Sequence, residues 1–188
     1  MYLARIELDP QRSPGLDQWA AMGRAVRRAV DPDPAPDIRV LWARTSPTTL
    51  VVSSDTAPAW GKVPGAISAT IRPMSRYPEG ETIRWELITA PTTQSEAEPT
   101  VEKPRPRSKK TPLPEEEFED WLNHKLAEAV DITSVKWKRL GGRPARHHFT
   151  GEAVVLDSEA LHELALKGIG AGTATGAGLL LTSPLAPK

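Results

Sequence analysis

The chain of 188 residues contains no cysteine, which excludes a disulfide framework, a thiolate metal site and a cysteine nucleophile. It also contains no apolar run close to the ~20 residues that a membrane-spanning helix needs. Residues 1–8 alternate apolar and polar side chains and include Arg5 and Glu7, which is typical of a strand and not of a signal peptide. We therefore expect a cytoplasmic protein that has no membrane partner and needs no metal or cofactor.

An excess of charge of either sign is also absent. Lys+Arg and Asp+Glu both number 24, so the net charge of zero excludes attraction to nucleic acid by total charge alone. The charges are unevenly distributed, however. Residues 130–150 contain one acid, Asp131, and five bases: Lys136, Lys138, Arg139, Arg143 and Arg146. This distribution predicts a local basic surface on a neutral protein.

The first half of the chain alternates strand and helix patterns. Apolar side chains at helical spacing predict a helix over 16–30, which ends where Asp31-Pro32-Asp33-Pro34 removes backbone donors. Strands are predicted over 2–8, 38–44, 49–53, 66–72 and 81–89. The order of strand, helix, strand, strand and later strand indicates a ferredoxin-like domain over 1–91.

Residues 92–113 are rich in proline, threonine, serine and charge, and such a segment buries too little apolar surface to offset the entropy of ordering. We interpret it as a flexible linker; a basic arm, Lys103 to Lys110, that folds onto phosphates is the alternative.

A second domain is expected over 114–188. Its predicted elements are a helix over 112–130, strands over 132–140 and 147–156, a helix that Asp157 or Ser158 caps, and a strand over 179–182. The fold class is therefore α+β, with tandem ferredoxin-like, or RRM-like, βαββαβ domains.

A glycine-rich segment lies between the last predicted helix and the last strand. It holds five of the 13 glycines: Gly168, Gly170, Gly172, Gly176 and Gly178. Glycine lets a backbone approach another chain closely, and successive free N–H groups can hold a phosphate. A dinucleotide-binding loop follows a strand and precedes a helix. Here the order is reversed, which argues against a dinucleotide site.

This segment, followed by Ser183-Pro184-Leu185, resembles the C-terminal signature of the CRISPR repeat-RNA processing family, and the CasE-type subunit of type I-E Cascade most of all. The first residues of this sequence, Met1-Tyr2-Leu3, are also similar to the start of CasE-type chains. Further similarities are Trp-Glu-Leu-Ile-Thr-Ala-Pro at 85–91, Pro-Leu-Pro-Glu at 112–115 and Gly-Glu-Ala-Val-Val at 151–155. The resemblance covers nearly the whole chain in the correct order.

The resemblance implies two ferredoxin-like domains that bind the stem-loop of CRISPR repeat RNA on a basic surface beside the glycine-rich loop. Family members cleave the precursor at the base of the hairpin without metal. The 2′-hydroxyl attacks the adjacent phosphodiester and leaves a 2′,3′-cyclic phosphate. They then stay on the 3′ stem-loop of the crRNA, as a subunit of Cascade with its other subunits. This chemistry requires a base for the 2′-hydroxyl, an acid for the leaving oxygen and positive charge for the phosphorane.

The sequence departs from the family at the catalytic positions. The resemblance implies a histidine on the first helix, with a tyrosine three residues earlier, but this chain has Gly23 and Ala20 there. Neither can move a proton. Thr173 stands where the family often has a lysine in the glycine-rich loop, and Glu86 and Ile88 stand in a stretch that is usually rich in arginine. The sequence therefore favours an RNA-binding protein that has lost nuclease activity.

Two alternatives remain open. One is an active endoribonuclease with a relocated site at His147 or His148, which lie in a basic turn. The other is a scaffold subunit of a Cascade-like complex that contacts little RNA. For RNA contact we predict five glycines of the loop and seven basic side chains: Gly168, Gly170, Gly172, Gly176, Gly178, Arg24, Arg27, Arg28, Lys136, Lys138, Arg143 and Arg146.

Overall fold

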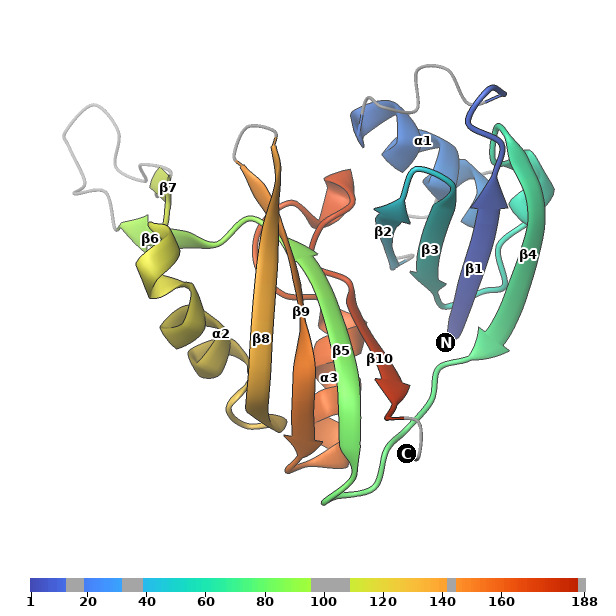
Figure 1. Ribbon diagram of the computed structural model, residues 1–188. Helices are drawn as coiled ribbons and strands as arrows, with labels where there is room; N and C mark the ends of the chain where they lie inside the picture. Colours follow the sequence, from blue (N-terminus) through green and yellow to red (C-terminus); the bar gives the residue numbers. More distant parts are fainter. Residues whose placement is uncertain (13–18, 32–38, 96–108, 142–144, 186–188) are drawn as a thin grey trace, which may run out of the picture.

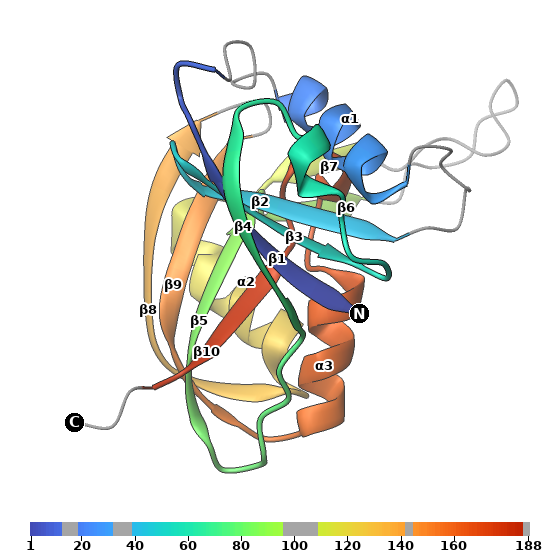
Figure 2. The same ribbon diagram turned by 90° about the vertical axis from the view of Figure 1, so that its right-hand side faces the viewer.

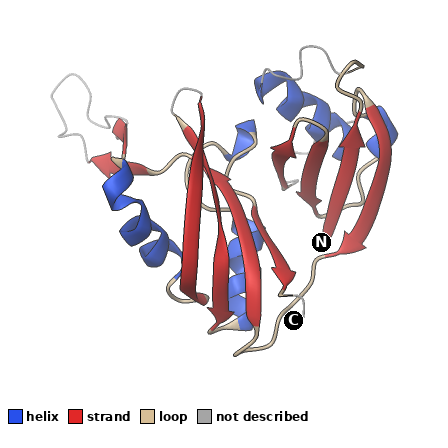
Figure 3. Ribbon diagram, viewed as in Figure 1, coloured by secondary structure: helices blue, strands red, loops and turns tan. Residues whose placement is uncertain are grey.

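Two four-stranded antiparallel sheets form the framework of the computed structural model, which describes residues 1–12, 19–31, 39–95, 109–141 and 145–185 (Figures 1 and 3). In the described parts of the chain, no helix is long and apolar enough to cross a membrane.

The first sheet has the strand order β2-β3-β1-β4. Its strands are β1 (Tyr2–Leu8), β2 (Val40–Ser46), β3 (Thr49–Ser54) and β4 (Ala66–Pro73). Alternate side chains of β1, at Ala4, Ile6 and Leu8, are buried against α1 (Trp19–Val30), which contributes Met22 and Val26 to the same core. A short 3₁₀ turn, η1 (Trp60–Lys62), stands where a ferredoxin-like unit has its second helix.

The second sheet has the strand order β10-β5-β9-β8. Its strands are β5 (Thr82–Thr89), β8 (Val130–Gly141), β9 (Arg146–Val155) and β10 (Leu180–Pro184), with α2 (Phe118–Leu126) and α3 (Ser158–Lys167) between them in the chain. Counted along the chain, both sheets follow the same ferredoxin-like order, with the first strand between the third and the fourth. The predicted α+β class with tandem ferredoxin-like folds is confirmed.

The strand β5 belongs to the second sheet, although the expected N-terminal domain of residues 1–91 includes it. It pairs with β9 on one side and β10 on the other. The sheets therefore divide between Pro73 and Thr82. Alternation of side chains along a strand identifies the strand but does not identify its partners, which is why the pattern alone does not assign β5.

The two ends of the segment predicted as a flexible linker form a small sheet. The strand β6 (Thr92–Ser95) pairs with β7 (Lys109–Pro112) in an antiparallel register that joins Thr92 to Pro112. Residues 96–108, which include most of the predicted basic arm, lie outside the described residues.

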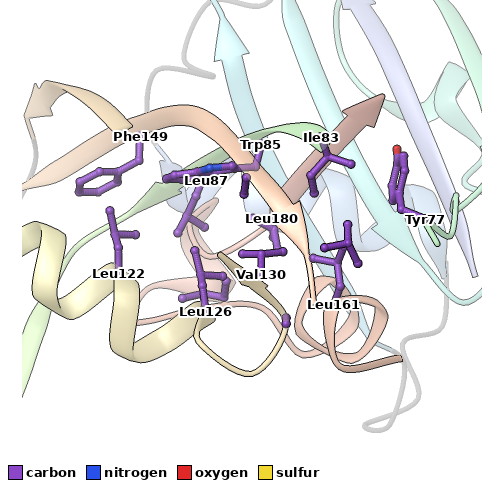
Figure 4. Close-up of a cluster of buried hydrophobic side chains, with 14 of the residues drawn as sticks. Tyr77, Ile83, Trp85, Leu87, Leu122, Leu126, Val130, Phe149, Leu161 and Leu180 are labelled. Carbon is purple, nitrogen blue, oxygen red and sulfur yellow. The ribbon is translucent and has the colours of Figure 1, made fainter. Parts of the chain in front are cut away.

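The helices α2 and α3 pack on the same face of the second sheet (Figure 1). Figure 4 shows Leu122 and Leu126 of α2 and Leu161 of α3 directed toward the sheet side chains Ile83 and Leu87. The helix predicted over 112–130 is shorter in the structure, with a 3₁₀ turn, η2 (Glu115–Glu117), before it and β8 beginning at Val130. The predicted cap on α3 is confirmed at Asp157, which accepts the N–H groups of Glu159 at 2.8 Å and Ala160 at 2.9 Å.

The two sheets contact each other through the faces that carry no helix. Apolar side chains from β2, β3, β5 and the residue before β10 form this contact: Leu41, Ala43, Val51, Ile88 and Leu179. Figure 2 shows the strands of the first sheet crossing those of the second. The helix α1 covers the face of the first sheet that is turned away from this contact, and α2 and α3 cover the corresponding face of the second sheet.

Candidate functional site

Arg146, the first residue of β9, joins the two halves of the protein. Its guanidinium carbon lies 4.3 Å from the ring centroid of Trp19, at the start of α1. Its Nη2 donates a 2.9 Å hydrogen bond to Oγ1 of Thr175 in the glycine-rich loop. Burial lowers the pKa of Arg146 from its usual value. The start of β9, the loop and α1 therefore meet at one place, which we call the junction.

The glycine-rich loop packs into the junction because glycine tolerates its backbone geometry. All five of its glycines have positive φ, from 76° at Gly168 to 93° at Gly172. A Cβ on Gly176 would lie 2.5 Å from the ring of Trp42, the buried indole that stacks on Trp19 with centroids 5.8 Å apart. The glycines thus serve close packing against β2 and α1.

Several N–H groups of the loop are engaged within the protein. Ile169 and Ala177 donate to loop carbonyls, and Gly178 donates a 2.6 Å hydrogen bond to the Ile88 carbonyl of β5. Gly176 and Gly178 are buried, and Gly168 donates to the carbonyl of Leu164 at the end of α3. These three glycines do not offer the predicted phosphate cradle, whereas Gly170 and Gly172 are exposed.

The helix α1 carries the predicted arginines on its exposed face. Arg24, Arg27 and Arg28 are exposed, opposite the buried Met22 and Val26. The sequence of α1 contains no acid, and within the described part of the chain these arginines form no ion pair. Three guanidinium groups are thus left to bind anions from outside the chain.

Ala20 and Gly23, which the sequence resemblance aligns with the family's catalytic pair, also lie on α1. Ala20 is exposed and Gly23 is half-buried, and their spacing of three residues places them on one side of the helix. The same helix contacts η3 (Thr173–Thr175) of the glycine-rich loop. Neither position carries a side chain that can donate or accept a proton.

The predicted bases of the second half are only partly brought together. Lys136 and Lys138 are exposed on β8, the edge strand of the second sheet, and their cross-strand partners are Thr150 and His148. They lie on the sheet face that carries no helix. Arg143 lies outside the described residues.

His147 is a core residue. Its ring packs edge-on against Phe118 with centroids 4.7 Å apart, and its side chain is 8 % exposed. Nε2 lies 3.6 Å from a carboxylate oxygen of Glu115. Burial is the main cause that lowers its pKa below 6.5, and Arg139 acts in the same direction while Glu115 opposes it. Among the described residues Nδ1 has no hydrogen-bond partner.

His148 points to the opposite face of β9, as alternation along a strand requires. Its Nε2 lies 2.7 Å from Oε1 of Glu86 on β5, and its side chain is 9 % exposed. Both candidates for a relocated catalytic base are therefore buried. Each has a glutamate as its neighbour.

A cleft of about 570 Å³ opens between the two sheets, beside their apolar contact. Arginines from three strands line it, namely Arg5, Arg72 and Arg84, together with the apolar Leu3 and Leu181. Arg5 pairs with Glu7 at 3.2 Å and Arg84 with Glu152 at 3.9 Å. Among the described residues, no group of His, Asp and Glu side chains converges to hold a metal ion.

Sequence patterns do not reveal the aromatic part of the junction. Trp19 and Trp42 stand at apolar positions of a helix and a strand, where the pattern predicts core residues and nothing more. Thr175 is one small residue among several in the loop. The only signals in the sequence are a tryptophan at a helix start and an arginine at a strand start, and the pattern does not pair them.

Comparison with known structures finds the same fold in CRISPR-associated proteins. A structure described as CRISPR endoribonuclease Cse3 bound to 19 nt RNA matches with a TM-score of 0.81 and 23% identity, over 97% of this chain and 99% of that one. The CRISPR-associated protein Cas6e from Escherichia coli K-12 matches with a TM-score of 0.72 and 20% identity, over 98% and 100%. A chain of E. coli Cascade bound to a PAM-containing dsDNA target matches with a TM-score of 0.57 and 22% identity, over 98% and 100%.

A comparison with curated protein sequences finds no match. The sequence model of one family, described as CRISPR associated protein, matches residues 1–184. That range includes every strand and helix of both sheets, so the resemblance seen in the sequence is confirmed. The chain belongs to the CRISPR-associated protein family.

Proposed function

We propose that this protein binds the stem-loop of CRISPR repeat RNA and remains on the crRNA 3′ hairpin as a subunit of a type I-E Cascade-like complex, in the cytoplasm. Structures with the same fold include Cse3 with bound RNA and a subunit of E. coli Cascade. The family match over residues 1–184 supports the same class of function.

The arginine face of α1 is the observation that carries this proposal. Arg24, Arg27 and Arg28 are exposed on a helix without acids, and that helix contacts the glycine-rich loop. Like charges one helical turn apart repel one another, and an external anion removes this cost. A phosphate backbone supplies anions at regular spacing, and the guanidinium fork matches phosphate geometry.

Binding without cleavage is the function that the site supports best. A transesterification by the 2′-hydroxyl needs a group that takes its proton and a group that protonates the leaving oxygen. Ala20 and Gly23 provide neither, and His147 and His148 are buried against Phe118 and Glu86. An active nuclease with a relocated histidine stays the alternative, and a product detected in EDTA would favour it.

The experiment compares the binding of two RNAs at several salt concentrations. One is the stem-loop of the repeat from the same genome, and the other is a stem-loop of equal length and unrelated sequence. We expect the cognate RNA to bind more tightly, with an affinity that falls as salt rises. Substituting Arg27 and Arg28 by Gln should reduce the slope of log K against log salt by about 1 for each phosphate that the variant no longer binds.

The matched control is the substitution of Arg76 by Gln. Arg76 is exposed but pairs with Glu159 on α3, so its removal should leave the salt slope unchanged. Equal affinity for the two RNAs, or an unchanged slope in the Arg27/Arg28 variant, would contradict the proposal. Incubation of the wild-type protein with the repeat RNA in EDTA, with analysis for a 2′,3′-cyclic phosphate, separates binding from cleavage.

The cleft between the sheets favours a second candidate function, the binding of a partner subunit. Its walls combine Leu3 and Leu181 with Arg5, Arg72 and Arg84, and with one acid, Glu86. An apolar segment with acidic flanks is complementary to such walls. Substituting Arg72 by Glu should weaken assembly with the other subunits and leave binding of the isolated stem-loop unchanged, which distinguishes a scaffold role from RNA binding.

A further inference from the structure

A second pocket is lined by the first residues of the glycine-rich loop, whose later residues contact α1. It has a volume of about 510 Å³, within the range of small-ligand sites. Its walls come from the β6–β7 sheet, α2, the last turn of α3 and the first residues of the loop. The lining residues that matter for binding are Thr93, Lys110, Trp121, His124, Lys125 and Gly170.

The ionisable groups that line this pocket are all basic. Lys110 on β7 and Lys125 on α2 are exposed, and His124 lies beside Lys125 on the same helix turn. Glu128 and Glu163 line an adjoining pocket that shares His124 and Lys125 with this one, and Glu163 pairs with Lys167. The pocket therefore presents positive charge from two sides and suits an anion.

One wall of the pocket is aromatic. Trp121 is half-buried on α2, where its ring is packed against the core of the second sheet. A Cβ on Gly170 would lie 3.3 Å from Cη2 of this ring, so only a residue without a side chain lets the loop pass this close to the indole. Gly170 has a φ of 81° and is exposed. The ring of Trp121 offers an apolar surface on which a base can stack, and the amines of Lys110 and Lys125 can contact its phosphate. Gly170 leaves room for the nucleotide beside the ring.

The same loop connects this pocket with the junction. Its first residues, Gly168 to Ala171, line the pocket, and its later residues, Thr173 to Gly176, pack against α1 and Trp42. A strand of RNA that leaves a stem held at α1 therefore reaches the pocket by crossing one loop.

We propose that this pocket holds an unpaired nucleotide of the RNA strand next to the stem, with its base on Trp121 and its phosphate between Lys110 and Lys125. This inference rests on the proposed function and adds a second contact to it. The site tolerates different bases, because stacking uses the face that every base has and the amines contact only the backbone.

The test uses the repeat stem-loop alone and the same stem-loop with four unpaired nucleotides on its 5′ or 3′ side. For at least one extended RNA, Lys125→Gln and Lys110→Gln should each lower the salt slope by about 0.7, the value for one single-strand phosphate. Trp121→Leu should weaken binding of that RNA roughly tenfold because stacking is removed, and Trp121→Phe should restore most of it. None of these variants should change the affinity for the stem-loop alone.

The control is Lys62→Gln, because Lys62 is exposed on η1 and does not line the pocket. A 4-thiouridine in the extension gives an independent measurement, since it should crosslink to the peptide that contains Trp121. Equal losses of affinity with and without the extension, or no loss with either, would overturn the inference. Failure of the stem-loop to bind wild-type protein would instead overturn the proposed function, so the two results are distinguishable.

Discussion

The guanidinium of Arg146 stacks on the indole of Trp19 and donates a hydrogen bond to Thr175. One side chain of the second sheet therefore contacts both α1 and the glycine-rich loop. Trp19 in turn stacks on Trp42 of the first sheet with an interplanar angle of 28°. The basic neighbourhood of Arg146 in the sequence predicts an RNA contact. The geometry adds a positioning role, because one N–H donor and one face of the guanidinium have partners within the protein. The RNA contact of Arg146 stays a prediction.

Replacing Arg146 by Met should destabilise the protein. A partly desolvated cation–π interaction and a hydrogen bond from a charged group together contribute about 1–2 kcal/mol. Urea unfolding of the variant should show this decrease in the free energy of unfolding. Arg146→Lys keeps the charge but removes the planar fork, so it should recover only part of the difference.

Arg72→Met is the matched control for Arg146→Met. Arg72 is exposed on β4 and forms no ion pair within the described ranges, so its removal should change stability by less than about 0.5 kcal/mol. If Arg146→Met is as stable as the control, the positioning role assigned to Arg146 is wrong.

Replacing Gly176 by Ala should be among the most destabilising single-methyl changes in the chain. The new Cβ would lie 2.5 Å from the buried ring of Trp42, at a φ of 80°. Backbone strain of about 1 kcal/mol and overpacking of about 1–3 kcal/mol act together, so the unfolding free energy should fall by about 2–4 kcal/mol.

Two other glycines separate these causes. Gly80 has the same φ of 80°, but a Cβ placed on it would have no neighbour within 4 Å, and Gly61 has open space without positive φ. Gly80→Ala should therefore show the strain alone, and Gly61→Ala should show neither effect. A Gly176→Ala variant no less stable than Gly80→Ala would mean that Trp42 moves aside without cost.

Local patterns predict most strands and helices, since alternation in β1 and the apolar spacing of α1 depend on neighbouring residues only. They also predict the exposed arginines of α1. They do not assign β5 to its sheet or pair Arg146 with Trp19, because both relationships join residues far apart in the chain. The buried position of His147 escapes them for the same reason: Phe118, which covers it, lies on a different element.

The stability of the protein should fall as pH drops below about 6.5, with His147 as one cause. Burial lowers the pKa of His147 in the folded chain, so the unfolded chain binds a proton more readily. Its contribution is fully present above the unfolded pKa. It is lost progressively as pH falls from there toward the lowered folded pKa, and it changes no further below that value.

The measurement is the free energy of unfolding between pH 7.5 and about 5 for wild type and His147→Phe. Phenylalanine keeps the edge contact with Phe118 and removes the titrating group, so the variant should lose less stability over this window. His124→Gln, an exposed position on α2, should follow the wild-type curve. Parallel curves for wild type and His147→Phe would exclude His147 as a source of the pH dependence.

Placing a histidine and a tyrosine on α1 should confer cleavage, if the junction presents the scissile phosphate to them. The double variant Ala20→Tyr, Gly23→His places both side chains on one side of the helix that contacts the loop. Gly23→His also replaces a poor helix former, so folding should not suffer. Positioned acid–base groups typically contribute about 10²–10⁴-fold in rate, and we expect a gain in that range.

The assay incubates each protein with repeat RNA in EDTA and follows a product that ends in a 2′,3′-cyclic phosphate. Wild type and Ala20→Tyr alone should leave the RNA intact, because neither has a histidine on α1 to take the proton from the 2′-hydroxyl.

If wild type cleaves, a base outside α1 acts, and His148 with its Glu86 neighbour is the first to substitute. If the double variant binds RNA normally but does not cleave it, the junction does not hold the scissile phosphate within reach of the two introduced side chains. Thr173, which the sequence resemblance aligns with a lysine common in the family, is then the next residue to replace, with lysine.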